Sequence, residues 1–120
     1  MKVAVSSVGD TLDSAVDPRF GRAAQFLLVD TDTGEHQLIS NAQNLNAAQG
    51  AGIQAAETVS RHGAEYVMTG HCGPKAFRVL NAAGIKVVVG AEGTVKSALE
   101  AFQAGNLTPS DSPDVEGHWA

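Results

Sequence analysis

The sequence is short of the features that mark secreted and membrane proteins. Among its 120 residues there is one cysteine, Cys72, so no disulfide can form within the chain. A reducing compartment suits such a chain, and we expect a cytoplasmic protein. No apolar run approaches the roughly 18 residues that a membrane-spanning helix requires, and the apolar residues after Lys2 are too few for a signal peptide.

Basic and aromatic residues are also scarce. Eight Lys and Arg stand against thirteen Asp and Glu, and this balance argues against a nucleic-acid partner, because phosphate contacts need a basic surface. Aromatic residues make up 5% of the chain, so the core must be mainly aliphatic. Residues 106–120 contain three of the acids and no Lys or Arg. We expect one domain over residues 1–107, an acidic and loosely held tail over 108–120, and a monomer.

Apolar runs and turn residues predict eight elements. The expected strands are Lys2–Ser7, Ala24–Asp30, His36–Ser40, Glu65–Thr69 and Ile85–Gly90, and the expected helices are Ala47–His62, Pro74–Ala83 and a third from a cap at Thr94 to Gly105. Strands that alternate with helices form parallel units with right-handed crossovers, while the first three strands form an antiparallel meander. These rules predict an α/β, ribonuclease H-like fold with one five-stranded mixed sheet of order 3-2-1-4-5 and helices on both faces.

Two glycines near the start of the first predicted helix need an explanation. Gly50 and Gly52 each weaken a helix by about 1 kcal/mol relative to alanine. We interpret them as positions where another segment of the chain approaches closely.

The predicted topology brings several loops to one edge of the sheet. The carboxyl ends of the parallel strands meet there, which is where open α/β sheets bind ligands. The long loop 8–22 and the link 41–46 reach the same edge. The residues expected to bind a ligand there are Ser6, Arg19, Phe20, Gly21, Arg22, Asn44, Gly70, His71, Cys72, Gly73 and Lys75.

The expected site is basic although the protein is acidic. Arg19, Arg22 and Lys75 gather there, and a helix that opens on Pro74 presents N–H groups without intrahelical partners. Both features favour an anionic ligand. Cys72 is either an inert, small apolar residue or a ligand or nucleophile, and His71 is either a polar loop residue or a ligand.

Several familiar chemistries lack their residues. The strand ends carry Ser6, Ser7 and Thr69 in place of the clustered carboxylates that two-metal phosphoryl transfer needs. One cysteine with one adjacent histidine cannot complete a structural zinc site, and sequence neighbours seldom form a Cys-His catalytic pair. The 70–73 turn is too short for a phosphate-binding loop of the Walker type.

Several motifs resemble the dinitrogenase iron–molybdenum cofactor biosynthesis family over about residues 1–108. They are the opening Lys2–Ser7 strand, the tetrapeptide Phe20-Gly21-Arg22-Ala23, the Thr69-Gly70-x-x-Gly73-x-x-Ala76 turn and the Gly84-Ile85-Lys86-Val87 segment. The resemblance implies a ribonuclease H-like carrier, scaffold or store for an anionic metal–sulfide cluster, and no enzyme. A molybdenum–copper sulfide cluster is the cargo it favours, with an iron–molybdenum–sulfur cluster as the second choice.

The resemblance also implies which segments face the cluster. They are the loop at Phe20–Arg22 and the turn at Gly70–Gly73, with His71 and Cys72 as candidate metal ligands. Proteins that donate or accept the cluster are the expected partners. Two alternatives stay open: a small enzyme or sensor that binds a phosphate or nucleotide at the same edge, and an interaction module whose cleft is vestigial.

Overall fold

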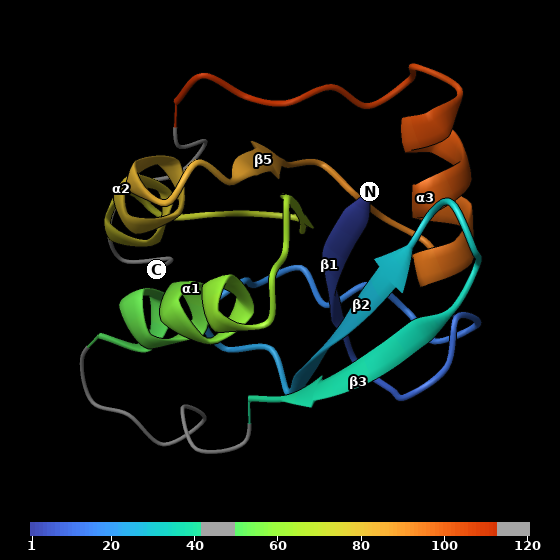
Figure 1. Ribbon diagram of the computed structural model, residues 1–120, viewed down its shortest axis with the longest axis horizontal. Helices are drawn as coiled ribbons and strands as arrows, with labels where there is room; N and C mark the ends of the chain where they lie inside the picture. The colour runs from blue at the N-terminus through green and yellow to red at the C-terminus, as the bar shows by residue number, and fades with distance from the viewer. Residues whose placement is uncertain (42–49, 113–120) are drawn as a thin grey trace.

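The computed structural model describes residues 1–41 and 50–112 of the chain. Its centre is one five-stranded sheet in the order β3-β2-β1-β4-β5 (Figure 1). The strands are β1 (Lys2–Ser7), β2 (Gln25–Asp30), β3 (His36–Ser40), β4 (Tyr66–Met68) and β5 (Lys86–Val88). The predicted sheet order is therefore confirmed.

Strand β1 is the middle of the sheet and joins its two halves. It pairs antiparallel with β2, where Val5 lies opposite Leu27, and parallel with β4, where Val5 lies opposite Met68. Strands β3 and β5 form the edges through antiparallel and parallel pairing respectively. Residues 3–7 of β1 are all buried, as expected for a strand that is covered on both faces.

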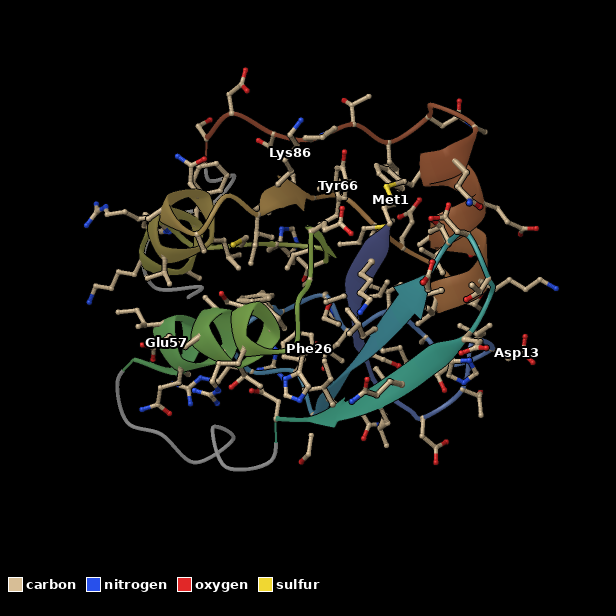
Figure 2. All side chains as sticks on the ribbon, viewed as in Figure 1. Met1, Asp13, Phe26, Glu57, Tyr66 and Lys86 are labelled. Atoms are coloured by element: carbon tan, nitrogen blue, oxygen red, sulfur yellow. The ribbon has the colours of Figure 1, made fainter. Side chains whose placement is uncertain are left out.

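The three helices cover both faces of the sheet. Helices α1 (Ala51–Arg61) and α2 (Pro74–Ala82) pack side by side on one face, and α3 (Val95–Gln103) covers the other (Figure 1). Alternation along the strands sends Phe26 into the core under α1 and α2 and Val5 into the core under α3. Side chains fill the space on both sides of the sheet (Figure 2).

Element bounds differ from the sequence expectation mainly at the first helix. The predicted start at Ala47 is wrong, because Gly50 has a left-handed backbone with φ of 75° and cannot continue a right-handed helix. Residues 47–49 lie outside the described residues. Strands β4 and β5 are shorter than predicted: β4 lacks the expected Glu65 and Thr69, and β5 lacks the expected Ile85, Val89 and Gly90.

The segment after α3 returns to the sheet. Leu107 packs on the core under α3, and the backbone N–H of Ser110 donates to the Val87 carbonyl at 2.7 Å. This bond belongs to an isolated antiparallel bridge between Ser110 and Val87 of β5, so the chain beyond residue 107 contacts the outer side of that edge strand. That the tail as a whole is loosely held stays a prediction, and residues 113–120 lie outside the described part.

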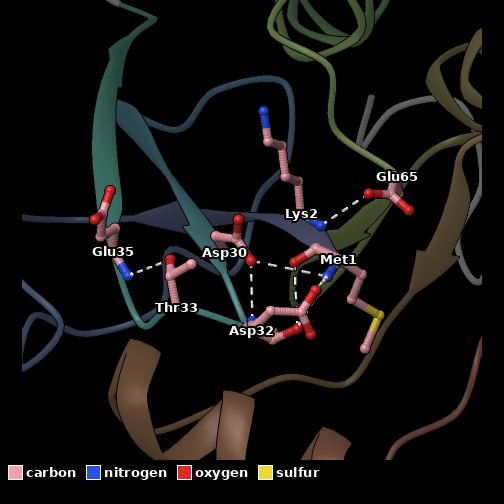
Figure 3. Close-up of polar contacts among 8 residues, drawn as sticks. Met1, Lys2, Asp30, Asp32, Thr33, Glu35 and Glu65 are labelled. Carbon is pink, nitrogen blue, oxygen red and sulfur yellow. Dashed lines mark hydrogen bonds and ion pairs between the residues drawn. The ribbon is translucent and has the colours of Figure 1, made fainter.

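Charged groups gather where β1 begins, at the end of the sheet opposite the carboxyl ends of the parallel strands. The Met1 ammonium lies 2.9 Å from the Asp32 carboxylate and 3.8 Å from that of Asp30, and the Lys2 N–H donates to Glu65 at 3.1 Å (Figure 3). The hydrogen bond to Asp32 raises the pKa of the amino group above its usual value.

In the described residues, no helix is both long enough and apolar enough to cross a bilayer.

Candidate functional site

The loop 8–22 is fastened to the carboxyl ends of β1 and β4, as the topology predicted. The Ser6 carbonyl accepts from the Asp17 N–H at 2.9 Å. The Ser6 hydroxyl donates to the Asp17 carbonyl at 2.7 Å and lies 2.9 Å from the Thr69 hydroxyl. Ser6 and Thr69 are fully buried, so these bonds are made away from competing water.

The same loop pairs with the turn that follows β4. The His71 N–H donates to the Pro18 carbonyl at 2.7 Å, and the Phe20 N–H donates to the His71 carbonyl at 3.3 Å. Together they form a short parallel bridge between Arg19 and His71. A Cβ on Gly70 would lie 2.8 Å from the Pro18 Cα, so glycine is what allows the two backbones to approach.

The Phe20–Arg22 segment is held by the first turn of α1. A Cβ on Gly21 would lie 2.8 Å from the backbone nitrogen and Cα of Gly52. This contact confirms the close approach that the sequence predicted for Gly52. The same prediction is wrong for Gly50, where an added Cβ would meet nothing within 4 Å and the left-handed backbone is what favours glycine. The ring of Phe20 is buried against Phe26, with centroids 5.2 Å apart, and anchors the segment from below.

The helix N-termini differ in how their N–H groups are satisfied. At α3 the Thr94 and Ser97 side chains form a capping box, and the Val95 and Lys96 N–H groups donate to carbonyls of loop 8–22 at 2.9 Å. At α2 the cap is Gly73, which makes no side-chain hydrogen bond, and Pro74 follows it. The first turn of α2, whose N–H groups have no side-chain cap, thus begins three residues after His71 of the Arg19–His71 bridge.

The predicted binding residues separate by exposure. Arg19 and Lys75 are exposed, and Arg22 and His71 are half-buried. Gly21, Gly70 and Gly73 are buried and contribute backbone. Six of these seven residues belong to the paired loop and turn, and Lys75 lies in the first turn of α2, whereas Asn44 lies outside the described residues.

Three of the predicted residues point into the protein. The side chains of Ser6, Phe20 and Cys72 are 0%, 1% and 0% exposed. Cys72 belongs to the core under α1 and α2, where its thiol lies 3.8 Å from the Gly73 carbonyl. These side chains support the loop and the turn, and Cys72 would reach a ligand at the edge only after a local rearrangement.

Sequence reasoning missed Asn41, which supports the same loop. Its side-chain nitrogen lies 3.3 Å from the Gly21 carbonyl and 2.8 Å from the Ala23 carbonyl. The sequence placed the link 41–46 at this edge, but an asparagine directly after a strand reads as a turn or cap residue, and its bonds to the loop carbonyls were not predicted.

Within residues 1–41 and 50–112, no three His, Cys, Asp or Glu side chains are grouped so that they would hold a metal ion. The described part of the edge offers N–H groups, arginine and lysine side chains, and one half-buried imidazole. Such a donor set suits a ligand that is an anion as a whole.

The fold and this edge define a class: small α/β domains in which a loop with two arginines meets a helix N-terminus that has no side-chain cap, at the carboxyl ends of the parallel strands. The comparison with family models then names the family. The model described as dinitrogenase iron–molybdenum cofactor matches residues 1–105, and the chain belongs to that family.

Similar proteins support this assignment. The apo form of the orange protein from Desulfovibrio gigas is 43% identical with a TM-score of 0.93, over 95% of this chain and 96% of that one. The structure of a putative NifB protein from Thermotoga is 34% identical with a TM-score of 0.80, over 95% and 98%. An uncharacterized protein of Methanocaldococcus jannaschii is 26% identical over 111 residues, which are 89% of this chain and 93% of the relative.

Proposed function

We propose that this protein binds an anionic metal–sulfide cluster at the edge formed by loop 8–22 and the first turn of α2, and serves as its carrier, scaffold or store. The cargo we favour is a molybdenum–copper sulfide cluster. The observation that carries the proposal is the backbone bridge between Arg19 and His71, which joins the loop that carries Arg19 and Arg22 to the turn that leads into α2. Family membership supports a cofactor-related role.

A preassembled sulfide cluster matches the donors at this edge. Sulfide already coordinates the metals of such a cluster, so few protein ligands are needed. Its negative charge is met by Arg19, Arg22 and Lys75 and by the N–H groups of α2. His71 supplies an imidazole for copper or iron at the rim, and Cys72 a thiolate if the turn opens. The binding is thus mostly non-covalent, and the protein acts without catalysis.

Reconstitution tests the proposal directly. The purified protein is mixed with tetrathiomolybdate and a copper(I) salt, desalted, and measured by visible spectroscopy and metal analysis. We expect charge-transfer bands and both metals in the protein fraction. A colourless protein without metal after desalting would refute the proposal.

The same N–H groups would also bind a phosphate, and this supports a second candidate function. A small enzyme or sensor that binds a nucleotide would use the open turn at Gly73 without any metal. Titration calorimetry with nucleotides and inorganic phosphate decides between the two. Micromolar binding in metal-free buffer, with no uptake of tetrathiomolybdate, would favour this second function.

A further inference from the structure

Asn41 stands immediately after β3 and is fully buried at the candidate edge. Its side-chain amide donates to the Gly21 carbonyl at 3.3 Å and to the Ala23 carbonyl at 2.8 Å, and its backbone N–H donates to the Ala24 carbonyl at 3.1 Å. One buried residue therefore holds the main chain on both sides of Arg22.

These bonds complete the fixing of the backbone around Arg22. The peptide group before Arg22 is held by Asn41 through the Gly21 carbonyl. The peptide group between Arg22 and Ala23 is placed by the Ala23 N–H, which lies 3.5 Å from the Phe20 carbonyl. The peptide group after Ala23 is held by Asn41 through the Ala23 carbonyl. Because each residue has only two soft backbone dihedrals, three placed peptide groups determine where the Arg22 Cα lies.

The donor character of the amide is what this arrangement requires. Both carbonyls are acceptors, and an asparagine NH₂ group carries two hydrogens, one for each. An aspartate of the same shape would present oxygens to two carbonyl oxygens. An alanine would leave both buried carbonyls without these donors, which costs more than a hydrogen bond contributes when it forms.

We propose that Asn41 is a positioning residue that sets the place of the Arg22 charge at the sheet edge and thereby the affinity for anionic cargo. The inference rests on the proposed function and extends it to a residue that does not touch the cargo. Asn41 acts through Arg22, because a shift of the backbone on either side of Arg22 changes the distance between its guanidinium group and the bound anion.

A double-mutant cycle in affinity tests this coupling. The variants are Asn41→Ala, Arg22→Gln and the double variant, with Asn41→Asp as the isosteric replacement. Asn81→Ala, an exposed asparagine on α2, is the matched control. The probe is tetrathiomolybdate with copper(I), and the affinity is corrected for the folded fraction, which urea denaturation gives for each variant.

We expect Asn41→Ala to weaken binding about tenfold, within the coupling range of residues in one network, and the double variant to bind within about twofold of Arg22→Gln. A purely structural role would lower stability and leave the corrected affinity unchanged, and that result overturns the inference. Independent, multiplying losses of affinity overturn it too. If the wild-type protein binds no cargo, both the proposed function and this inference fail. If the wild-type protein binds and Asn41→Ala binds with the same corrected affinity, only this inference fails.

A measurement on the wild-type protein covers the case in which the Asn41 variants do not fold. Nuclear magnetic resonance follows the exchange of side-chain amide protons with solvent. We expect the Asn41 protons to exchange at least tenfold more slowly than those of exposed Asn81, as buried, bonded amides do. Equal exchange rates for the two side chains would show that the amide does not hold the carbonyls, and would overturn the inference.

Discussion

The His71 N–H lies 2.7 Å from the Pro18 carbonyl, and this bond joins the two segments on which the candidate site is built. Pro18 belongs to the long loop after β1, and His71 to the turn between β4 and α2. The contact pairs the backbone of Arg19 with that of His71, three residues before α2 begins at Pro74. It exists because Gly70 has no side chain to keep the Pro18 backbone away.

Gly70→Ala should therefore damage both stability and binding. Its Cβ would lie 2.8 Å from the Pro18 Cα and carbonyl oxygen, which are backbone atoms that cannot rotate away. We expect a loss of about 1–3 kcal/mol in the free energy of unfolding, as for overpacked sites, and weaker uptake of tetrathiomolybdate with copper. Urea denaturation and metal analysis measure the two effects.

Gly34→Ala is the control for this change. Gly34 has φ of 81° and open space around it, in the turn between β2 and β3 at the far edge of the sheet. It should lose about 1 kcal/mol through its backbone alone and keep full binding. Equal loss of binding in the two variants would show that general destabilisation, and no local contact, controls uptake.

Charge should outweigh thiol ligation at the site. Arg22→Glu reverses a half-buried charge in the loop, whereas Cys72→Ser changes a fully buried core side chain. We expect Arg22→Glu to weaken cargo binding about tenfold or more, the scale of one charge interaction near a protein surface, and to do so more than Cys72→Ser. Lys86→Glu makes the same charge change at an exposed position at the start of β5, at the opposite end of the sheet, and should leave binding unaltered. The opposite ranking of Arg22 and Cys72 would mean that a thiolate bond to the metal dominates.

Salt should weaken the complex. The attraction between an anionic cluster and exposed Arg19 and Lys75 is screened as ionic strength rises, because the Debye length falls from about 10 Å at 0.1 M to about 3 Å at 1 M. We expect the affinity for tetrathiomolybdate with copper, measured by spectrophotometric titration, to fall steadily with added salt. The double variant Arg19→Gln/Lys75→Gln should show a flatter dependence. If the wild-type affinity does not change with salt concentration, direct coordination of the metal by protein side chains is the main source of binding.

The cap of α3 should matter for stability and leave the cargo unaffected. The Thr94 hydroxyl accepts from the Ser97 N–H at 3.0 Å, and the N-terminus of this helix is already closed by loop carbonyls. Thr94→Ala should lower the free energy of unfolding by about 1 kcal/mol, a typical value for an N-cap. Thr108→Ala, at an exposed position without a cap, should change little. Loss of cargo binding by a stably folded Thr94→Ala variant would show that the α3 N-terminus belongs to the site.

The topology of this protein could be predicted from the sequence because the rules for strand connections are local and few. Alternating strands and helices after residue 50 imply parallel pairing, and short turns imply the meander before it. The same rules placed loop 8–22 beside the 70–73 turn, which the Arg19–His71 bridge confirms. The first helix was extended too far because an alanine-rich segment favours helix regardless of the left-handed Gly50.

The placement of individual side chains at the edge was beyond the sequence. Cys72 and Phe20 read as site residues because they stand beside the glycines and arginines of the motifs, yet both are buried in the core under α1 and α2. Asn41 read as a link residue, yet its amide holds two carbonyls of a loop far away in the chain. Burial and hydrogen bonding depend on which distant segments come together, and one residue's neighbours in sequence do not specify them.

By itself, then, the sequence determined the order and pairing of the strands and the edge at which the loops gather. Hydrophobic periodicity, turn chemistry and net charge depend on the order of residues alone and do not depend on how the side chains pack. Only the tertiary structure decided that carbonyls of loop 8–22 close the α3 N-terminus while no loop carbonyl of the described residues does so at α2, and that Cys72 lies inside. Those outcomes follow from close contacts such as Gly70 with Pro18 and Gly21 with Gly52, whose partners are known only once the chain has folded.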